Sequence, residues 1–325
     1  MKNEKFGWAI IGSGYIAKIC GLQLRISKNH RVVSIYSRNQ KTAESLARIT
    51  GGDIYDTLQK AVTADGVDGV YIATPHSVHA VQAIRCLELK KPVLIEKAIC
   101  VNTEELLELL RVADEGRVYV SEAMWTRYNH VTRKVVEWIE AGRIGKITGI
   151  TATFSFDANT KFTPPRVREN RYAGGALLDV GVYPIAYCQM LLGKAAVIEC
   201  ESFINESDVD AHDEITLTYQ SGALCKLYCG IDGKRPKEAI IQGESGKIVV
   251  GSFSNAIKAT LVTNTEREVY RKICTYMPEF DKVASDIKEG KLQSDEMTHR
   301  DSIEVLQMID ECRRQIGLIY DNDKR

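Results

Sequence analysis

The chain has 325 residues, 44% of them hydrophobic, and its 43 Lys and Arg residues balance its 43 Asp and Glu residues. That length is typical of about two globular domains, and the zero net charge excludes an overall electrostatic attraction to nucleic acid or to an anionic membrane. We therefore expect a small-molecule partner, with no nucleic acid and no membrane. The N-terminus, MKNEKFGWAIIGSG, lacks a signal-peptide pattern and no apolar run reaches membrane-spanning length, so we expect a cytoplasmic protein.

The first recognisable element is a short apolar strand, FGWAII, that leads into the turn GSGYIA. Gly12, Gly14 and Ala17 have the G-x-G-x-x-A spacing of a dinucleotide-binding loop. Gly12 would permit a tight turn, Gly14 would let backbone N–H groups approach a pyrophosphate, and Ala17 would let the following helix pack closely. The same kind of turn also occurs in S-adenosylmethionine enzymes. We expect the cofactor to contact Gly12, Ser13, Gly14, Tyr15 and Ile16.

A second strand, RVVSIYSR, ends with Ser37 and Arg38, about 20 residues beyond the glycines, where NAD-binding loops carry Asp or Glu. A carboxylate there would hydrogen-bond the ribose 2'-hydroxyl of NAD, whereas a guanidinium and a hydroxyl suit the 2'-phosphate of NADP. The sequence therefore predicts NADP in preference to NAD. The alternative is that Arg38 is only a solvated loop residue.

Three further apolar runs, GVDGVYIATP, KPVLIEKA and RVYVSEAM, alternate with helical patterns at about residues 77–89 and 103–115. This alternation predicts a doubly wound parallel sheet, in which ligands bind beyond the carboxyl ends of the strands. Among the residues at or near those ends, we expect cofactor contacts from Thr74, Pro75, His79, Glu96 and Lys97. For His76 and His79 two interpretations stay open, a place beside the nicotinamide or an exposed first turn of a helix.

Four motifs, GSGYIA, ATPHSVH, EKAIC and GGALLDVGVYPI, follow one another in this order over nearly the whole chain. Together they resemble the glucose-fructose oxidoreductase and inositol dehydrogenase superfamily (Gfo/Idh/MocA). Within it, SEAMWTRY, DVGVYP and the tail IGLIY are most similar to dimeric dihydrodiol dehydrogenases and NADP-dependent xylose dehydrogenases. Two positions depart from the usual family pattern, since EKA replaces EKP and Tyr183 stands where many members carry His.

The resemblance implies an N-terminal Rossmann domain, residues 1–122, and a C-terminal α/β substrate-binding and dimerisation domain, residues 123–325, with a large, predominantly antiparallel sheet. The sequence agrees, because about eight strand-like runs separated by Gly, Asn and Asp turns occur in the second part. They are KITGITATFSFD, VIECESFIN, DEITLTYQ, ALCKLYCGI, AIIQG, KIVVG, KATLVT and REVYRKI. Helical patterns flank them at about residues 129–141, 174–192 and 295–317.

Asp179 and Tyr183 stand four residues apart in the expected helix and so share one of its faces. The resemblance implies that this helix stands over the nicotinamide, with Lys97 reaching in from the first domain. We expect Tyr183 to transfer the proton that hydride transfer requires, Lys97 to lower the phenol pKa, and Asp179 to hold a substrate hydroxyl or orient Lys97. The alternative is a helix in which Asp179 caps a backbone group, Tyr183 fills space and Lys97 is solvated.

Two groups of residues near this helix have open roles. Trp125 and Arg127 wall the substrate pocket in one interpretation and pack between domains in the other. Arg166, Arg168 and Arg171 contact substrate or cofactor, or belong to a solvated loop.

The sequence thus predicts an NADP-dependent oxidoreductase that transfers hydride between nicotinamide and a sugar, polyol or cyclic diol, as a homodimer or higher homo-oligomer. The alternatives are a non-catalytic sensor of the NADP redox state and a glycoside-cleaving enzyme with tightly bound NAD. No metal site is expected, because the one close cysteine pair, Cys225 and Cys229, lacks the further Cys or His pair of a zinc site. Their alternating pattern instead places both thiols on the same face of a strand.

Overall fold

Contacts within the chain divide it into two compact units. The computed structural model describes residues 5–161 and 163–324. The first unit comprises the residues up to Cys100, Glu104–Met124 and Tyr276–His299, and the second comprises Val101–Thr103, Trp125–Thr275 and the residues from Arg300 onward. This division differs from the predicted boundary of 1–122 and 123–325, because residues 276–299 pack with the first unit although they come late in the sequence.

The first unit is built on a six-stranded sheet in the order β3-β2-β1-β4-β5-β6, with all neighbouring strands parallel. Its strands are β1 (Phe6–Ile11), β2 (His30–Tyr36), β3 (Asp53–Tyr55), β4 (Gly69–Ile72), β5 (Val93–Glu96) and β6 (Val120–Ala123). Its helices are α1 (Tyr15–Ile26), α2 (Gln40–Thr50), α3 (Leu58–Val62), α4 (His79–Glu88), α5 (Thr103–Gly116) and α9 (Met277–Lys288). The predicted doubly wound parallel sheet is confirmed.

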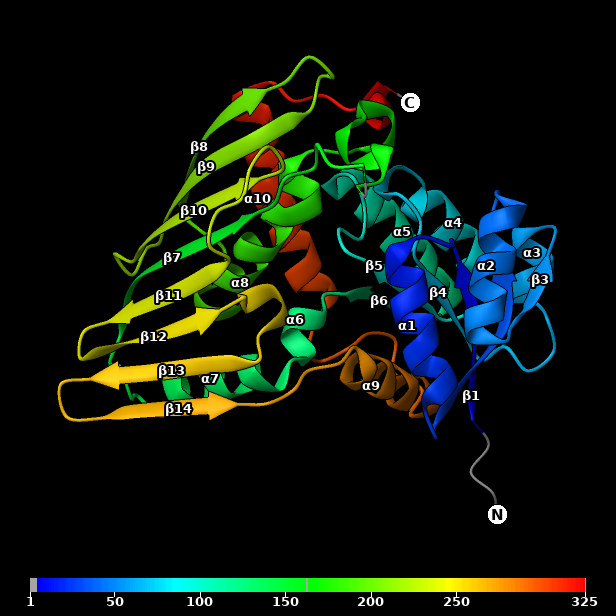
Figure 1. The fold of residues 1–325 in the computed structure, drawn as a ribbon, viewed down its shortest axis with the longest axis horizontal. Helices are drawn as coiled ribbons and strands as arrows, with labels where there is room; N and C mark the ends of the chain where they lie inside the picture. Colours follow the sequence, from blue (N-terminus) through cyan, green and yellow to red (C-terminus); the bar gives the residue numbers. More distant parts are fainter. Residues whose placement is uncertain (1–4, 162, 325) are drawn as a thin grey trace. The chain divides into compact units, whose positions relative to one another are not determined.

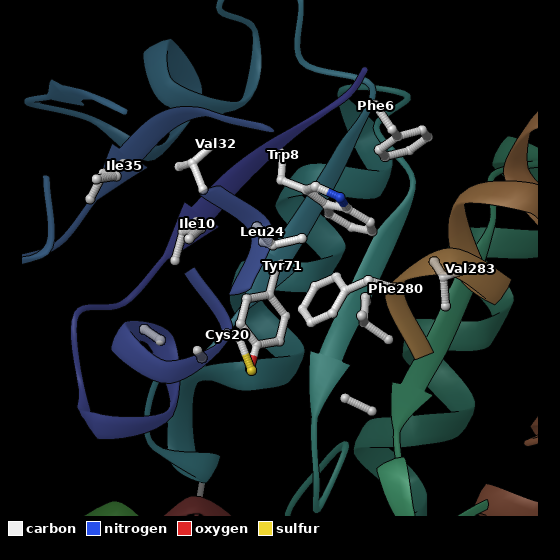
Figure 2. Packing of buried hydrophobic residues seen from close by; sticks show 14 of the residues in the cluster. Phe6, Trp8, Ile10, Cys20, Leu24, Val32, Ile35, Tyr71, Phe280 and Val283 are labelled. Atoms are coloured by element: carbon white, nitrogen blue, oxygen red, sulfur yellow. The ribbon is translucent and has the colours of Figure 1, made fainter. Parts of the chain in front are cut away.

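Helix α9 completes the core of this unit, although more than two hundred residues separate it from β1 in the sequence. In Figure 1 it lies beside α1, and Figure 2 shows its Phe280 ring between Trp8 of β1 and Tyr71 of β4. The ring centroids are 5.2 Å from Trp8 and 5.1 Å from Tyr71, both with edge-to-face geometry. All three side chains are fully buried, so α9 covers apolar surface that the parallel sheet would otherwise expose.

The second unit contains an eight-stranded sheet in the order β14-β13-β12-β11-β7-β10-β9-β8. Among the described strands of this sheet, only β7 and β10 are parallel neighbours, so the predicted, predominantly antiparallel sheet of eight strands is confirmed. The strands are β7 (Ile147–Ser155), β8 (Val197–Ile204), β9 (Asp210–Thr218), β10 (Leu224–Gly230), β11 (Glu238–Gly243), β12 (Gly246–Gly251), β13 (Lys258–Thr263) and β14 (Arg267–Arg271). The helices are α6 (Trp125–Tyr128), α7 (His130–Glu140), α8 (Val182–Leu192) and α10 (His299–Ile316).

The two faces of this sheet differ in their cover. Figure 1 shows α7, α8 and α10 on one side of it. On β8, residues alternate between half-buried and exposed, and Val197 and Phe203 on the exposed side keep 53% and 56% of their surface open. On β10, Cys225 and Cys229 both lie on the buried side, as the alternating pattern predicted. One face of the sheet therefore packs against helices, while the other face carries exposed apolar side chains.

The helix expected at residues 174–192 begins differently from the prediction. A five-residue π-turn, Leu177–Gly181, precedes α8, so Asp179 lies in the π-turn and Tyr183 in the first turn of α8. Contrary to our expectation, the stretch Asn170–Leu192 has the length and hydropathy of a membrane-spanning helix, but 78% of its most apolar window is buried inside the protein. Its apolar character therefore serves the core of the second unit.

Phe280→Ala should destabilise the first unit strongly, because it opens a cavity between Trp8 and Tyr71. Deleting a buried Phe side chain costs about 3–5 kcal/mol, whereas Ile273→Ala, at a side chain that is 86% exposed, should change the free energy of unfolding by less than about 0.5 kcal/mol. Urea denaturation followed by intrinsic fluorescence measures both variants. Equal stability of the two variants would show that α9 is not part of the first core.

Candidate active site

Gly12 and Gly14 shape the loop between β1 and α1. Gly12 has a φ of +106°, which glycine adopts readily, and a Cβ at this position would overlap the carbonyl oxygen of Ala73. Gly14 caps α1, and a Cβ there would meet no atom within 4 Å, while Ala17 is fully buried against the sheet. The backbone at Gly14 is therefore accessible to a ligand, and the free N–H groups in the first turn of a helix suit the phosphates of a dinucleotide.

Three hydroxyl groups meet beside this loop. Ser13 Oγ lies 2.7 Å from Ser37 Oγ, just after β2, and 2.6 Å from Thr42 Oγ1 in the first turn of α2. Asn39 caps α2 by accepting a hydrogen bond from the Thr42 N–H at 3.2 Å, and Arg38 is exposed next to it. Hydroxyls and a guanidinium at a helix N-terminus suit a phosphate. The sequence analysis missed Thr42, which its position in a first helical turn could have indicated.

The loops after β4 and β5 are joined by a buried histidine. His79 Nδ1 lies 3.0 Å from the Ala98 carbonyl oxygen, and its Nε2 lies 2.8 Å from that of Thr74. His76 packs edge to face against it, with the ring centroids 5.6 Å apart. Both rings are buried, so the interpretation as an exposed first turn is wrong. His79 fixes the loop that starts at Thr74 and Pro75 relative to the loop that carries Lys97.

Hydrogen bonds to carboxylates hold the residues on either side of Lys97. Glu96 accepts a hydrogen bond from the buried Tyr71 hydroxyl at 2.5 Å, and Glu122 on β6 accepts one from the Ile99 N–H at 3.2 Å. Lys97 itself is half-buried, and its peptide bond to Ala98 is cis. The predicted cofactor residues Glu96 and Lys97 therefore stand at the carboxyl end of β5, on a backbone held from two neighbouring strands.

In the second unit, Gly174 lets one backbone segment cross another. A Cβ on Gly174 would overlap the carbonyl oxygen of Arg166 and lie 2.6 Å from that of Val167. This crossing brings the Arg166 guanidinium to Asp179, with Nη1 3.0 Å from Oδ1. Asp179 is 6% exposed and Arg166 is 36% exposed, so the acid lies at the buried end of the pair. The solvated-loop alternative is therefore wrong for Arg166, whereas Arg171 is exposed and pairs with Glu169.

Tyr183 is half-buried at the start of α8, beside an aromatic wall from the sheet. Its ring centroid lies 5.3 Å from that of Phe154 on β7, and Lys237 Nζ lies 3.7 Å from the centre of the Phe154 ring. A cation over an aromatic face is attracted to it, so both Tyr183 and Lys237 hold the Phe154 ring in place. Asp179 and Tyr183 therefore occupy one continuous segment, with the Arg166 cation beside Asp179 and the Phe154 ring beside Tyr183.

The two residues expected to wall the substrate pocket are mostly buried. Trp125 and Arg127 are each 9% exposed on α6. The Arg127 guanidinium donates to the side-chain oxygen of Gln189 on α8 and lies 3.6 Å from an Asp301 oxygen on α10. Arg127 thus joins three helices within the second unit, a role that neither interpretation described.

Two carboxyl groups are completely buried under the sheet-facing side of the π-turn. Asp210 and Asp213 of β9 are both fully inaccessible. Burial and the neighbouring Asp213 carboxyl raise the pKa of Asp210, and burial raises the pKa of Asp213 to about 7. The other titratable or polar groups around the pair come from β8, β10, α10 and the C-terminal segment, and they include Cys200, Ser202, Cys229, Cys312 and Tyr320. None of these carries a positive charge, so the pair is stable while it retains a proton.

The predicted site residues thus fall into two groups, one in each unit. The first unit holds the dinucleotide loop, the hydroxyl cluster of Ser13, Ser37 and Thr42, and Lys97 at the end of β5. The second unit holds Asp179 and Tyr183, with Arg166 and Phe154 as their neighbours. A loop for a dinucleotide and a segment with an acid and a phenol are the parts that a dehydrogenase needs.

Comparison with known families assigns both units. Residues 6–124 match the oxidoreductase family with an NAD-binding Rossmann fold, and residues 132–249 match the GFO/IDH/MocA C-terminal domain. The chain belongs to the GFO/IDH/MocA oxidoreductase family. The resemblance seen in the four sequence motifs is confirmed, and the first unit is an NAD(P)-binding domain.

Individual relatives span nearly the whole chain. Trans-1,2-dihydrobenzene-1,2-diol dehydrogenase of Mus musculus is 28% identical and the match covers 98% of this chain and 99% of the relative. D-xylose 1-dehydrogenase (NADP(+)) of Hypocrea jecorina is also 28% identical, over 96% of this chain and 92% of the relative. Among solved structures, the 3-ketoreductase KijD10 of Actinomadura kijaniata in complex with NADP and TDP-benzene has a TM-score of 0.86 at 23% identity, covering 96% of this chain and 98% of that one. That structure shares the fold.

Asp213→Asn should make the stability of the protein less dependent on pH. A buried carboxyl with a raised pKa stabilises the fold when protonated, so its contribution is complete below the unfolded value of about 3.9 and is lost as pH rises through the folded value. For Asp213 this loss falls between about pH 4 and about pH 7. We expect the thermal midpoint of the native protein to fall more than that of Asp213→Asn on going from about pH 5 to about pH 8.

The matched control is Asp208→Asn, which alters an exposed carboxyl in the same hairpin. It should keep the pH dependence of the native protein. A thermal midpoint that depends on pH equally in Asp213→Asn and in the native protein would contradict the prediction.

Proposed function

We propose that the protein is an NADP-dependent dehydrogenase that moves a hydride between nicotinamide and a CH–OH group of a sugar, polyol or cyclic diol. The observation that carries the proposal is the pairing of Asp179 and Tyr183 on one mostly buried segment, in a chain whose other unit holds a dinucleotide loop. The relatives named above act on a diol and an aldose, which supports a polyhydroxy substrate. We also propose that the protein acts in the cytoplasm.

The chain's own residues would manage the proton and the orientation of the substrate. When bound, the nicotinamide supplies or accepts the hydride. Tyr183 gives a proton to the carbonyl oxygen during reduction and takes one from the hydroxyl during oxidation. Asp179, held by Arg166 at 3.0 Å, accepts a hydrogen bond from a second substrate hydroxyl. The family resemblance adds Lys97, whose ammonium lowers the phenol pKa; Lys97 and Tyr183 belong to different units, and their joint action rests on that resemblance.

The electrostatic requirement for this assignment is modest. A free phenol has a pKa of about 10, and lowering it to about 8 requires about 2.7 kcal/mol. One ammonium at about 4 Å supplies about 4 kcal/mol at an effective dielectric constant near 20. A single lysine is therefore sufficient to make Tyr183 an effective acid and base near neutral pH.

The preference for NADP is supported by the surroundings of the predicted 2'-phosphate position. Ser13, Ser37 and Thr42 gather three hydroxyls at the N-terminus of α2, and no carboxylate occupies the residue after β2. Arg38 adds an exposed guanidinium. These groups would compensate a doubly charged phosphate, whereas NAD would leave them without a ligand. The relative from Hypocrea jecorina is named for NADP(+), which agrees with this preference.

We also propose a homodimer that forms through the open face of the eight-stranded sheet. The strand register places four exposed apolar side chains on that face, and they are Val197, Phe203, Leu224 and Val269. Phe203, His212 and Tyr228 stack in a row across β8, β9 and β10, with centroid distances of 5.7 and 5.9 Å. Rigid aromatic and apolar surface of this kind is typical of protein interfaces.

The proposed activity is tested by a screen of aldoses, polyols and trans-dihydrodiols with NADP and with NAD, following the absorbance of the reduced nicotinamide. We expect turnover with NADP for at least one of these substrate classes. Turnover with none of them would contradict the proposed function. Purification with stoichiometric, tightly held NAD would instead favour the glycoside-cleaving alternative.

Arg38→Ala should weaken NADP selectively. Loss of a charge-assisted hydrogen bond to the 2'-phosphate costs about 1.5–3 kcal/mol, which is about a tenfold to hundredfold loss of affinity. NAD lacks this phosphate, so its affinity should stay nearly unchanged. Fluorescence titration with both cofactors measures the difference, and an equal loss for both would rule out the role of Arg38.

Tyr183→Phe should keep NADP binding and lose turnover by a factor of about 10² to 10⁴, the usual contribution of a positioned acid or base. Lys97→Met should lose a similar factor and move the alkaline limb of the residual activity to higher pH, because the phenol pKa would rise. Asp179→Asn should act more on KM. The measurement is kcat and KM against pH, and a near-normal kcat in Tyr183→Phe would leave Lys97 as the proton donor.

Phe203→Glu should disrupt the dimer, because it places a carboxylate in apolar surface that the dimer would desolvate. The control is Ile26→Glu, which changes a side chain that is 74% exposed on α1 of the first unit and should leave assembly intact. Light scattering at micromolar concentration measures both. A native protein with only the mass of a single chain would refute the dimer.

A further inference from the structure

The π-turn that carries Asp179 rests on a buried cluster of two acids and one thiol, Asp210, Asp213 and Cys229, which we call the acid–thiol cluster. Asp210 Oδ2 accepts a hydrogen bond from the Leu177 N–H at 2.5 Å, at the first residue of the π-turn. A Cβ on Gly181, the last residue of the π-turn, would lie 2.8 Å from Cys229 Sγ. The cluster thus meets the π-turn at both of its ends.

The members of the cluster are connected to one another. Asp213 and Cys229 are directly opposite each other on β9 and β10, and the Cys229 thiol donates to Asp213 Oδ2 at 3.2 Å. The carboxyl groups of Asp210 and Asp213 interact on the same strand. A continuous path of polar contacts therefore runs from the Leu177 N–H through β9 to the thiol beneath Gly181.

Asp210 also explains the second glycine of the motif that begins at Gly174. Gly175 has a φ of +115°, and a Cβ there would overlap Asp210 Oδ1. The carboxyl group therefore contacts the backbone at Gly175, just before the π-turn, and accepts a hydrogen bond from it at Leu177, the first residue of the π-turn. Leu177 lies two residues before Asp179. Because the N–H groups of a first helical turn have no partner within the helix, an acceptor at this point fixes the start of the segment.

We propose that Asp210 is a positioning residue for the reaction, which sets where the Asp179 carboxylate and the Tyr183 hydroxyl stand by anchoring the π-turn at Leu177. This inference rests on the proposed function of Asp179 and Tyr183. An apolar side chain of similar size would fill the same space without accepting from Leu177. Asparagine would retain an acceptor oxygen, so the role depends on a hydrogen-bond acceptor and not on charge.

Burial of the pair makes the anchor rigid. Asp210 and Asp213 are fully inaccessible, and Tyr320, also fully buried, closes the cluster from the C-terminal segment. Arg313 of α10 holds the Tyr320 ring, with its guanidinium carbon 4.5 Å from the ring centre. Water therefore cannot replace Asp210 as the partner of Leu177 without opening the core of the second unit.

The test compares Asp210→Val with Asp210→Asn in the full-length protein. Asp210→Val should lose kcat by about tenfold to hundredfold, the effect of a misplacement of about 1 Å at a reacting centre, with NADP affinity unchanged. Asp210→Asn should restore most of the activity. If Asp210→Val does not fold, Asp210→Ser replaces it, since a side chain one atom shorter leaves the Leu177 N–H without its acceptor.

Ile215→Ala is the matched control for loss of stability. Ile215 is buried on the same strand, and its truncation should lower stability while kcat stays close to that of the native protein. If Ile215→Ala loses kcat to the same extent as Asp210→Val, or if Asp210→Asn is as impaired as Asp210→Val, the positioning role is overturned.

Amide hydrogen exchange gives a readout that needs no substrate. In Asp210→Val the peptide that contains Leu177–Tyr183 should exchange faster, whereas in Asp210→Asn and Ile215→Ala it should keep native protection. Unchanged protection in Asp210→Val would overturn the inference. A native protein without dehydrogenase activity would refute the proposed function and leave this comparison of exchange rates intact, so the two failures are distinguishable.

Discussion

The close approach of one backbone segment to another, at positions where a side chain would not fit, determines where the functional groups of both units lie. In the first unit, Gly12 passes over the Ala73 carbonyl and delivers the N-terminus of α1 to open space. In the second, Gly174 passes over the carbonyl groups of Arg166 and Val167, and Gly175 passes over Asp210. A methyl group at any of these positions would push the segments apart and carry the functional residues with them.

Each important acid of the candidate site is fixed by a donor from a different element. The Tyr71 hydroxyl donates to Glu96, the Ile99 N–H donates to Glu122, and the Arg166 guanidinium donates to Asp179. A carboxylate in such surroundings needs compensation for the water it loses, and a donor from another element also fixes its direction. The site residues are therefore oriented before any ligand binds, which is what preorganised catalysis requires.

Much of this arrangement was readable in the sequence, because local patterns report local structure. The glycine loop, the parallel alternation of the first unit and the eight strands of the second all follow from short-range periodicity and turn residues. The sequence analysis did not predict the place of α9 in the first core. The local pattern of a helix does not indicate which sheet it covers, and its partner Trp8 lies far away in the sequence. The ion pair of Arg166 with Asp179 and the contact of Asp210 with Leu177 depend on a chain crossing and a strand pairing that no local pattern encodes.

The late position of α9 has a consequence for the order in which the protein can fold during synthesis. Domains at the N-terminus usually fold first as the chain leaves the ribosome. Here all six strands of the parallel sheet have been made by Ala123, but Phe280 is made more than 150 residues later. Trp8 and Tyr71 of the nascent first unit therefore stay uncovered by α9 while all the strands of the second unit's sheet are translated. A fragment that ends after β6 would carry the complete dinucleotide loop on a sheet whose apolar surface attracts chaperones or other unfolded chains.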